Sequence, residues 1–480
     1  MRLKNFILKN KVLLLIMAAG LLLRLIFLFF GAEIYYGKKD FMVGGDTSSW
    51  LDSIKNLIDH GTYTFSFATP NGYFFRPPGY PFFIGFFYLL AGKNVLLAYH
   101  FISAAQIAMD VIAIFFFQQL ALFVTNSVRT ANLSSLLYAF YPFIIVWNPV
   151  VYAESSSVFF LVISLYYFFH PSCRLHYLWS GVFISISILI RLQTFFILPF
   201  LGLVLLIRFR NNIRALFIQG LQFFLAILLI YGAWPARNYI NYHRVVFSQD
   251  LNVGGNWSPD YMAFMDYVFS IQTDHEPEYS QIIHRQKVQW PSAAYLVKSD
   301  SEKLAFVSAL SGKCGTGFSH FMANAGLRND VLTTDSLNCD SIIAKIYTEL
   351  KASQIKNNPV HYYLQVPLSN LKKAIFKTDL LKQKSSVVAL ATSALFFYRT
   401  FLIFLGLIGI YFGFRNRSLG RQFFFVALGF FVLWYFYLSF VYRNMEIRYL
   451  LQCDLLLLIP AAMILVQLAE KYKLLRKESA

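Results

Sequence analysis

Two carboxylates in this sequence have surroundings that set them apart. Asp46 lies in VGGDTSSW, residues 43–50, between two glycines and three hydroxyl residues, shortly after a long apolar run. Glu154 lies in YPFIIVWNPVVYAESSSVFFL, residues 141–161, where polar residues border an apolar run. A positioned carboxylate can take a proton from a reacting hydroxyl, and it can equally cap a helix or interact with the helix dipole. Both interpretations stay open for each residue at this point.

Several arginines accompany these carboxylates at the borders of apolar runs. Guanidinium groups hold phosphates and carboxylates through paired hydrogen bonds, so they could complete an anion site. Arg76 lies in FRPPGYP, residues 75–81, where the prolines fix φ and predict a rigid turn. For each arginine the alternative is snorkelling toward lipid headgroups. The candidates are Arg76, Arg191, Arg237, Arg443 and Arg448.

The elements that must position these residues are membrane helices. The chain has 480 residues, of which 57% are hydrophobic and only 14% are charged. A bilayer-spanning helix needs about 20 apolar residues, and such runs recur along the sequence. We therefore expect an all-α polytopic membrane protein with about ten transmembrane helices, the first of them retained because no small-residue cleavage site follows it. The predicted spans are 12–31, 96–124, 131–148, 153–169, 177–190, 193–207, 215–234, 396–414, 422–441 and 449–468.

The distribution of positive charge predicts the orientation. Lys and Arg gather at the N-terminus, at the C-terminus and in every second short connection, which the positive-inside rule places in the cytoplasm. This topology accounts for the formal net charge of +18, so no nucleic-acid partner is expected. We expect a multi-pass protein of the cell (inner or plasma) membrane with both termini cytoplasmic. The long segments 32–95 and 235–395 then lie outside, and long loops on one face usually carry function.

This division predicts three parts. Residues 1–234 form an N-terminal transmembrane module whose first outer loop, 32–95, holds Asp46. Residues 235–395 form a mixed extracytoplasmic loop domain, and residues 396–480 form the C-terminal transmembrane helices and a cytoplasmic tail.

Other polar residues of the predicted helices and the outer domain have structural explanations. Arg24 and Asp110 fall within spans and are expected to pair, because a lone charge in lipid is costly. Asp454 lies about two turns into the last helix, where it is expected to line a lipid groove. In the outer domain, Cys314 and Cys339 form a disulfide in an oxidising compartment or remain two free thiols.

The motifs, in this order, resemble the bacterial members of the dolichyl-phosphate-mannose protein mannosyltransferase family, whose relatives include the lipid A aminoarabinose transferases. Both belong to the C-superfamily of membrane glycosyltransferases. The resemblance covers most of the chain, although the large outer segment matches only at residues 355–371. The matching segments are GGD with the helix after it, FRPPGYP, residues 141–161, ILIRLQTFFILP (188–199), GAWPARNY (232–239) and IRYLLQCDLLLLIPAAMIL (447–465).

The resemblance implies a glycosyltransferase C-type fold and transfer of a sugar from a polyprenyl-phosphate-linked donor. The acceptor would be a hydroxyl or phosphate on a glycan, a lipid or a protein. Asp46 would be the catalytic general base, and Glu154 would bind acceptor or sugar hydroxyls or hold a divalent metal, the one cofactor that some relatives use. The residues that would bind substrate and stabilise the departing phosphate are Arg76, Tyr80, Arg191, Arg237 and Arg448.

Two other functions use the same residues differently. A transporter or flippase of lipid-linked sugars or lipids would only bind through Asp46 and the arginines, and a glycan polymerase or ligase would share the lipid-phosphate site. Transporters commonly show internal repeats and charged sites at the bilayer midplane. Here no repeat is evident and the unusual residues gather at one surface, which favours the transferase. The sequence leaves the sugar and the acceptor open.

Overall fold

The computed structural model describes residues 10–171, 174–251, 257–295, 297–327, 336–376, 386–415 and 420–478, and these residues form helices without a β-sheet. The first half holds α2 (Lys11–Ile26), α3 (Ala32–Tyr36), α4 (Thr47–His60), α5 (Gly79–Leu90), α6 (Val95–Thr125), α7 (Val128–Ala139), α8 (Pro142–Ile145), α9 (Glu154–Phe169), α10 (His176–Ile190), α11 (Leu198–Phe209), α12 (Ile213–Ile230) and α13 (Ala233–Tyr242). The second half holds α14 (Pro259–Ile271), α15 (Glu276–Ile283), α16 (Lys298–Cys314), α17 (Thr316–Asn324), α18 (Ser336–Asn357), α19 (Val366–Phe376), α20 (Ser386–Arg415), α21 (Gly420–Phe436), α22 (Ile447–Leu456) and α23 (Leu458–Glu478). Short 3-10 and π segments are η1 (Phe27–Gly31), η2 (Pro70–Phe74), η3 (Leu192–Ile197), η4 (Ser292–Tyr295), η5 (His361–Gln365) and η6 (Tyr437–Tyr442).

The membrane-spanning character of the chain is confirmed. In the described ranges, six helical segments are long and apolar enough to cross a bilayer, or up to seven if the bent pair α22–α23 counts as one span. The predicted number of about ten is larger because it includes α7, α9 and α10, which have only 12, 16 and 15 residues. Helix α7 stops short of Pro142, since the residue before a proline disfavours helical geometry.

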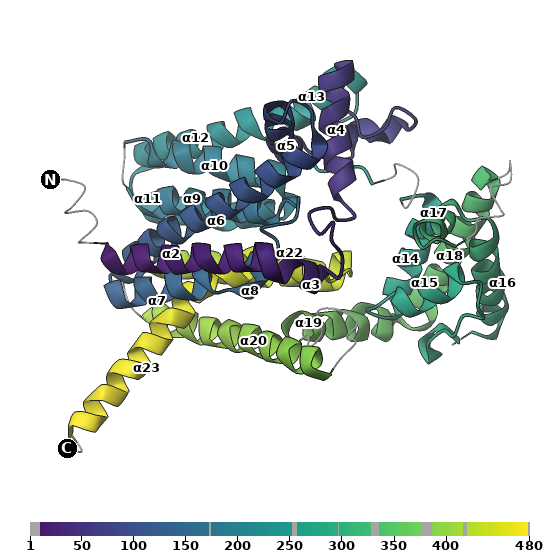
Figure 1. Cartoon of the computed structure of the whole chain (residues 1–480). Helices are drawn as coiled ribbons and strands as arrows, with labels where there is room; N and C mark the ends of the chain where they lie inside the picture. Colours follow the sequence, from purple (N-terminus) through teal and green to yellow (C-terminus); the bar gives the residue numbers. More distant parts are fainter. Residues whose placement is uncertain are drawn as a thin grey trace.

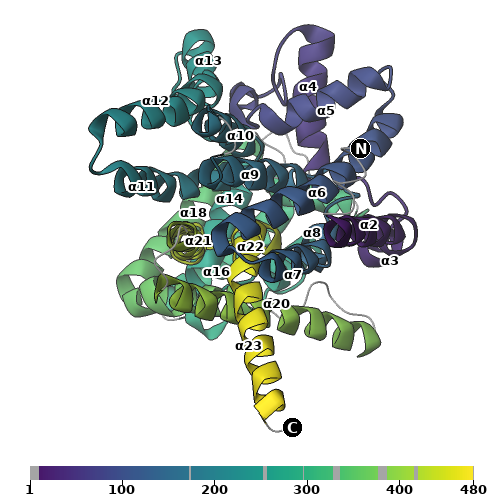
Figure 2. The same ribbon diagram turned by 90° about the vertical axis from the view of Figure 1, so that its left-hand side faces the viewer.

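The apolar helices pack into one bundle. Helix α6 packs against α7 and α9, α10 lies between α9 and α12, and α23 packs against α7 and α20. Figure 1 shows α6, α9, α10 and α12 side by side, and Figure 2, a quarter turn away, shows α23 extending from the other helices toward the C-terminus. The start of α2 and the end of α23 both lie at the left of Figure 1, whereas α4, α5 and α13 lie at the opposite end.

Two charge pairs are buried inside the bundle. Arg24 donates from Nε to Asp110 Oδ2 at 2.7 Å, which confirms the predicted pair, and Tyr138 donates to the other oxygen of Asp110 at 2.7 Å. Asp454 is 3% exposed and accepts hydrogen bonds from Arg399 at 2.7 Å and from a tyrosine hydroxyl on α21 at 2.6 Å. The expectation that Asp454 lines a lipid groove is therefore wrong. The reason is that α20 supplies a counter-ion, which a carboxylate buried in a membrane protein needs.

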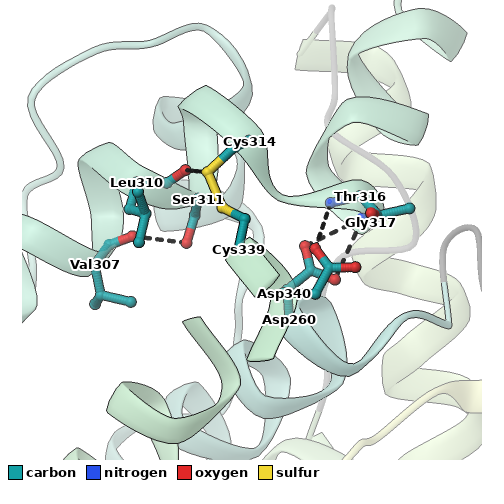
Figure 3. Close-up of a disulfide and its surroundings, with 9 residues drawn as sticks. All are labelled: Asp260, Val307, Leu310, Ser311, Cys314, Thr316, Gly317, Cys339 and Asp340. Carbon is teal, nitrogen blue, oxygen red and sulfur yellow. Dashed lines mark hydrogen bonds between the residues drawn. A yellow bond between two sulfur atoms is a disulfide. The ribbon is translucent and has the colours of Figure 1, made fainter. Parts of the chain in front are cut away.

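Helices α14–α18 pack around a core of their own, at the right of Figure 1. Cys314 at the end of α16 and Cys339 in α18 form a disulfide with Cα atoms 6.1 Å apart (Figure 3), which decides between the two alternatives for these thiols. Beside it, the carboxylates of Asp260 and Asp340 accept hydrogen bonds from backbone N–H groups at the start of α17. These contacts fix the ends of three helices against one another.

Candidate active site

The turn before α4 is held against the segment that leads into α9. The Thr47 hydroxyl donates to the carbonyl of Val151 at 3.1 Å, and the Val151 N–H donates to the carbonyl of Met42 at 2.9 Å. Gly44 lies so close to Tyr152 that a Cβ atom there would be 2.0 Å from the ring. Only glycine permits this approach, and the approach places Asp46 beside the start of α9.

Asp46 directly precedes α4, but its side chain makes no capping hydrogen bond. Its Oδ1 accepts a hydrogen bond from Nη2 of Arg76 at 2.8 Å, and its Oδ2 accepts one from Nη1 of Arg448 at 2.9 Å. Arg448 is 402 residues away along the chain, at the start of α22. The capping explanation of Asp46 thus gives way to a carboxylate held between two guanidinium groups, with 22% of its side chain still exposed.

Arg76 is held by its surroundings as the FRPPGYP turn predicts. Its Nε donates to the Ser49 hydroxyl at 2.9 Å, and its guanidinium carbon lies 4.8 Å from the centre of the Trp50 ring. Tyr80, the other predicted site residue of this turn, contacts neither Asp46 nor Arg76. Its side chain is fully buried, its hydroxyl donates to Gln106 at 2.7 Å, and its ring packs edge-on against Trp50. Tyr80 therefore supports the residue under Arg76 and is not placed to touch a substrate.

Arg448 joins Asp46 to the second carboxylate. Its Nη1 lies 3.9 Å from Oε1 of Glu154, and its Nε donates to Glu446 at 2.5 Å. Oε1 of Glu154 also accepts a hydrogen bond from Arg191, while its Oε2 is buried and has no protein partner in the described structure. Salt bridges therefore connect three arginines and three carboxylates in one continuous group, which we call the arginine–carboxylate cluster. Its members are Asp46, Arg76, Glu154, Arg191, Glu446 and Arg448.

The cluster controls the ionisation of Asp46. Burial raises the pKa of this carboxyl, but the positive charges of Arg76, Arg448 and Arg191 outweigh burial and lower the pKa to about 2. Asp46 is therefore ionised at physiological pH, with both oxygens bound to guanidinium groups. A carboxylate in this state is a poor proton acceptor until one of its arginines moves to another anion.

Two of the predicted arginines lie outside the cluster. Arg237 donates to the carbonyls of Tyr63 and Tyr73, both at 2.8 Å, and thereby holds the loop between α4 and α5 against α13. Arg443 donates to the carbonyl of Tyr362 at 2.9 Å and stacks on its ring at 3.7 Å. The structure brings neither of them into contact with Asp46.

Sequence reasoning missed three members of the neighbourhood. Glu446 lies two residues before Arg448 in MEIRY and binds its guanidinium, and Ser49 binds Arg76. The Tyr152 hydroxyl accepts a hydrogen bond from the N–H of Asp46 at 3.3 Å, and its ring lies under Arg448 at 5.2 Å. The closeness of Glu446 to Arg448 in sequence was an available signal, whereas nothing local marks Ser49 or Tyr152.

The cluster does not fit a divalent metal as it stands. Cations such as Mg²⁺ and Ca²⁺ need several free oxygen ligands, but both oxygens of Asp46 and one of Glu154 are bound to arginine. Three guanidinium groups would also repel a further cation. Among the described residues, no group of three or more His, Cys, Asp or Glu side chains is placed to hold a metal.

Solved structures share this architecture. The apo form of the oligosaccharyltransferase from Archaeoglobus fulgidus matches 98% of this chain with a TM-score of 0.52 and 14% sequence identity. The chain shares the fold of this archaeal membrane enzyme. It spans 52% of that protein's length. The same archaeal enzyme, AglB, in complex with an inhibitory peptide and a dolichol-phosphate matches with a TM-score of 0.50 at 14% identity, over 98% of this chain and 51% of AglB.

A third match is weaker. ArnT from Cupriavidus metallidurans bound to undecaprenyl phosphate gives a TM-score of 0.34 and 13% identity, over 88% of this chain and 74% of ArnT. No protein-family model and no curated protein matches the sequence. The fold that the sequence motifs indicated is confirmed by the two matches to the archaeal oligosaccharyltransferase.

Proposed function

We propose that this protein is an integral membrane glycosyltransferase that moves a sugar from a polyprenyl-phosphate-linked donor to a hydroxyl or phosphate acceptor. The observation that carries the proposal is the position of Asp46 between Arg76 and Arg448. This arrangement places a proton acceptor beside two fixed cations suited to a lipid phosphate. The fold adds support, because a protein of this fold was captured with dolichol-phosphate.

In the proposed reaction the acceptor oxygen bonds to C1 of the sugar while the bond between C1 and the phosphate oxygen breaks. The electron pair of that bond goes to the lipid phosphate, and Arg76 and Arg448 stabilise the negative charge. The proton of an acceptor hydroxyl goes to Asp46. An ionised phosphate acceptor has no proton to lose, and it would need only the cations.

The low pKa of Asp46 fits this role if the donor competes for the same arginines. A phosphate that binds Arg76 and Arg448 withdraws positive charge from Asp46, which raises the pKa of the carboxyl toward its ordinary value. The base then becomes competent only when the leaving group is in place. Glu154 Oε2 is buried and has no protein partner within the described residues, so Glu154 binds a sugar or acceptor hydroxyl only when substrate binding exposes this oxygen.

The proposal includes the ten-helix topology and an extracytoplasmic site. The start of α2 and the end of α23 lie at one end of the bundle, which requires an even number of crossings. Seven crossings are odd, whereas adding α7, α9 and α10 to the seven spans makes ten. The positive-inside rule then places the termini in the cytoplasm of a cell membrane, and the cluster on the other side.

Mass spectrometry of membrane glycans, lipids and glycoproteins, with the protein present and absent, tests the function. We expect one sugar modification to depend on the wild-type protein and to disappear in the Asp46→Asn variant. Asp59→Asn is the matched control, because Asp59 lies in the same loop but forms a surface pair with Lys93. Unchanged modification in the Asp46→Asn variant would exclude the proposed base. If the protein moves a lipid-linked sugar across the membrane without transferring the sugar to an acceptor, the alternative function as a transporter or flippase is favoured.

A further inference from the structure

The outer domain contains a groove that the proposed reaction does not use. It lies between α15 with the segment after it and α16, and it has a volume of about 820 Å³, within the range of small-ligand sites. Its apolar floor includes Trp290 and Leu304, both buried. Tyr295 also lines it and is 46% exposed, so its ring is accessible. In Figure 1, α16 lies on the side of the outer domain away from the bundle.

The shape of the groove is built into the packing of these helices. Gly312 in α16 faces the end of α15, and a Cβ atom there would be 2.9 Å from the carbonyl oxygen of Ile282. The disulfide at Cys314 fixes the end of α16 two residues later. After α15 the chain turns at Arg285, whose φ of 53° lies in the left-handed region that non-glycine residues rarely adopt. These contacts fix the position of α16 relative to the end of α15 on one side of the groove.

The charged residues of the groove are all positive. Arg285, Lys287 and Lys313 line it and are exposed, and none of the lining residues is acidic. In the described structure these three cations form no salt bridge, although other surface lysines of this domain do, such as Lys303 with Glu349. A concave site with cations of one sign attracts anions, and the exposed ring of Tyr295 offers a flat apolar surface to a sugar ring.

We propose that this groove binds an anionic glycan, meaning an oligosaccharide that carries carboxylates or phosphates. The cations pair with the acidic groups, the exposed ring of Tyr295 packs against a sugar ring, and Ser301 and Gln286 bind hydroxyls. A lipid headgroup fits less well, since α16 faces away from the bundle. That such a glycan is the acceptor rests on the proposed function, but its binding does not.

Binding to the full chain in phosphatidylcholine nanodiscs tests this inference. The probes are a fluorescent oligogalacturonate, a neutral malto-oligosaccharide of the same length and an oligoglutamate peptide. We expect only the oligogalacturonate to bind, with an affinity that falls as salt rises. The double variant Lys287→Gln/Lys313→Gln should weaken binding about tenfold or more, because each lysine gives a charge-assisted hydrogen bond. The control is the double variant Lys298→Gln/Lys303→Gln. These two lysines lie in α16, as Lys313 does, but they do not line the groove, so this variant should bind as the wild type does.

Each other outcome overturns the inference. Equal binding of the neutral sugar would remove the role of charge, and equal or tighter binding of oligoglutamate would assign the groove to acidic peptides. Unchanged affinity in the Lys287→Gln/Lys313→Gln variant would place any binding elsewhere. The proposed function has a separate readout, because transfer to a neutral acceptor can survive the loss of this groove. Glycan binding can likewise persist in the Asp46→Asn variant, which lacks the base.

Discussion

Replacing Asp46 with asparagine gives the sharpest test of the cluster, because it should change catalysis and lipid binding in opposite directions. The Asp46→Asn variant keeps the shape of the side chain but removes the negative charge that holds Arg76 and Arg448. Loss of a general base typically lowers a rate about a hundredfold to ten-thousandfold. Loss of a competitor for the two arginines should instead strengthen the binding of a lipid phosphate.

The pKa of Asp46 gives a scale for that gain. Burial raises this pKa and the cations lower it, and the net change from 3.8 to about 2 corresponds to about 2 kcal/mol in favour of the carboxylate; the attraction to the arginines alone is larger, because it also offsets burial. If a phosphate had to replace the whole interaction, its affinity would rise about thirtyfold in the variant. A smaller rise is expected where the phosphate displaces only one of the two arginines.

The assay combines the binding of undecaprenyl phosphate to protein in nanodiscs with the rate of sugar transfer from the corresponding lipid-linked sugar. Asp59→Asn again serves as the control, because the pair of Asp59 with Lys93 is on the surface and contacts no member of the cluster. Weaker binding of undecaprenyl phosphate in the Asp46→Asn variant would refute the competition between carboxylate and phosphate. A normal transfer rate would remove Asp46 from the mechanism altogether.

Three further predictions address acidity, stability and topology. Arg448→Gln should raise the pKa of Asp46 in the free enzyme, so the acid limb of the pH profile of kcat/KM should move up by about 1–3 pH units; an unmoved limb would contradict the coupling. Cys314→Ser removes the disulfide and should destabilise the unit formed by α14–α18 by about 2–4 kcal/mol, measured by thermal unfolding with and without reductant; equal stability would show that the bond contributes nothing. A membrane-impermeant thiol reagent should label Ser292→Cys but not Asn211→Cys in intact cells, and the reverse pattern would invert the topology.

The site could be predicted from sequence only in part. The GGD turn and the FRPPGYP turn are local patterns of glycine and proline, so Asp46 and Arg76 could be found as candidates without any tertiary information. Arg237 lies in an equally suggestive motif, yet its guanidinium binds backbone carbonyls of the first loop. Type and spacing show that an arginine borders a helix, but they do not show which oxygens surround it.

The same limit applies inside the bundle. The pairing of Arg24 with Asp110 was predicted because each is an isolated charge in a long apolar run. Arg399 is also such a charge, and it is the partner of Asp454, but the two lie in different helices with no sequence signal that joins them. Which buried charges meet depends on how α20 and α22 pack.

The sequence by itself determined that this is a helical, multi-span membrane protein with long segments between the spans, because hydropathy and helix length act locally along the chain. Only the tertiary structure decided that Asp46 does not cap its helix. The carboxylate could accept hydrogen bonds from backbone N–H groups of α4 or from guanidinium groups. It accepts them from two arginines, one of which is 402 residues away along the chain. Charge-assisted bonds at a partly buried site are stronger than a cap, but they exist only when packing brings α4 and α22 together.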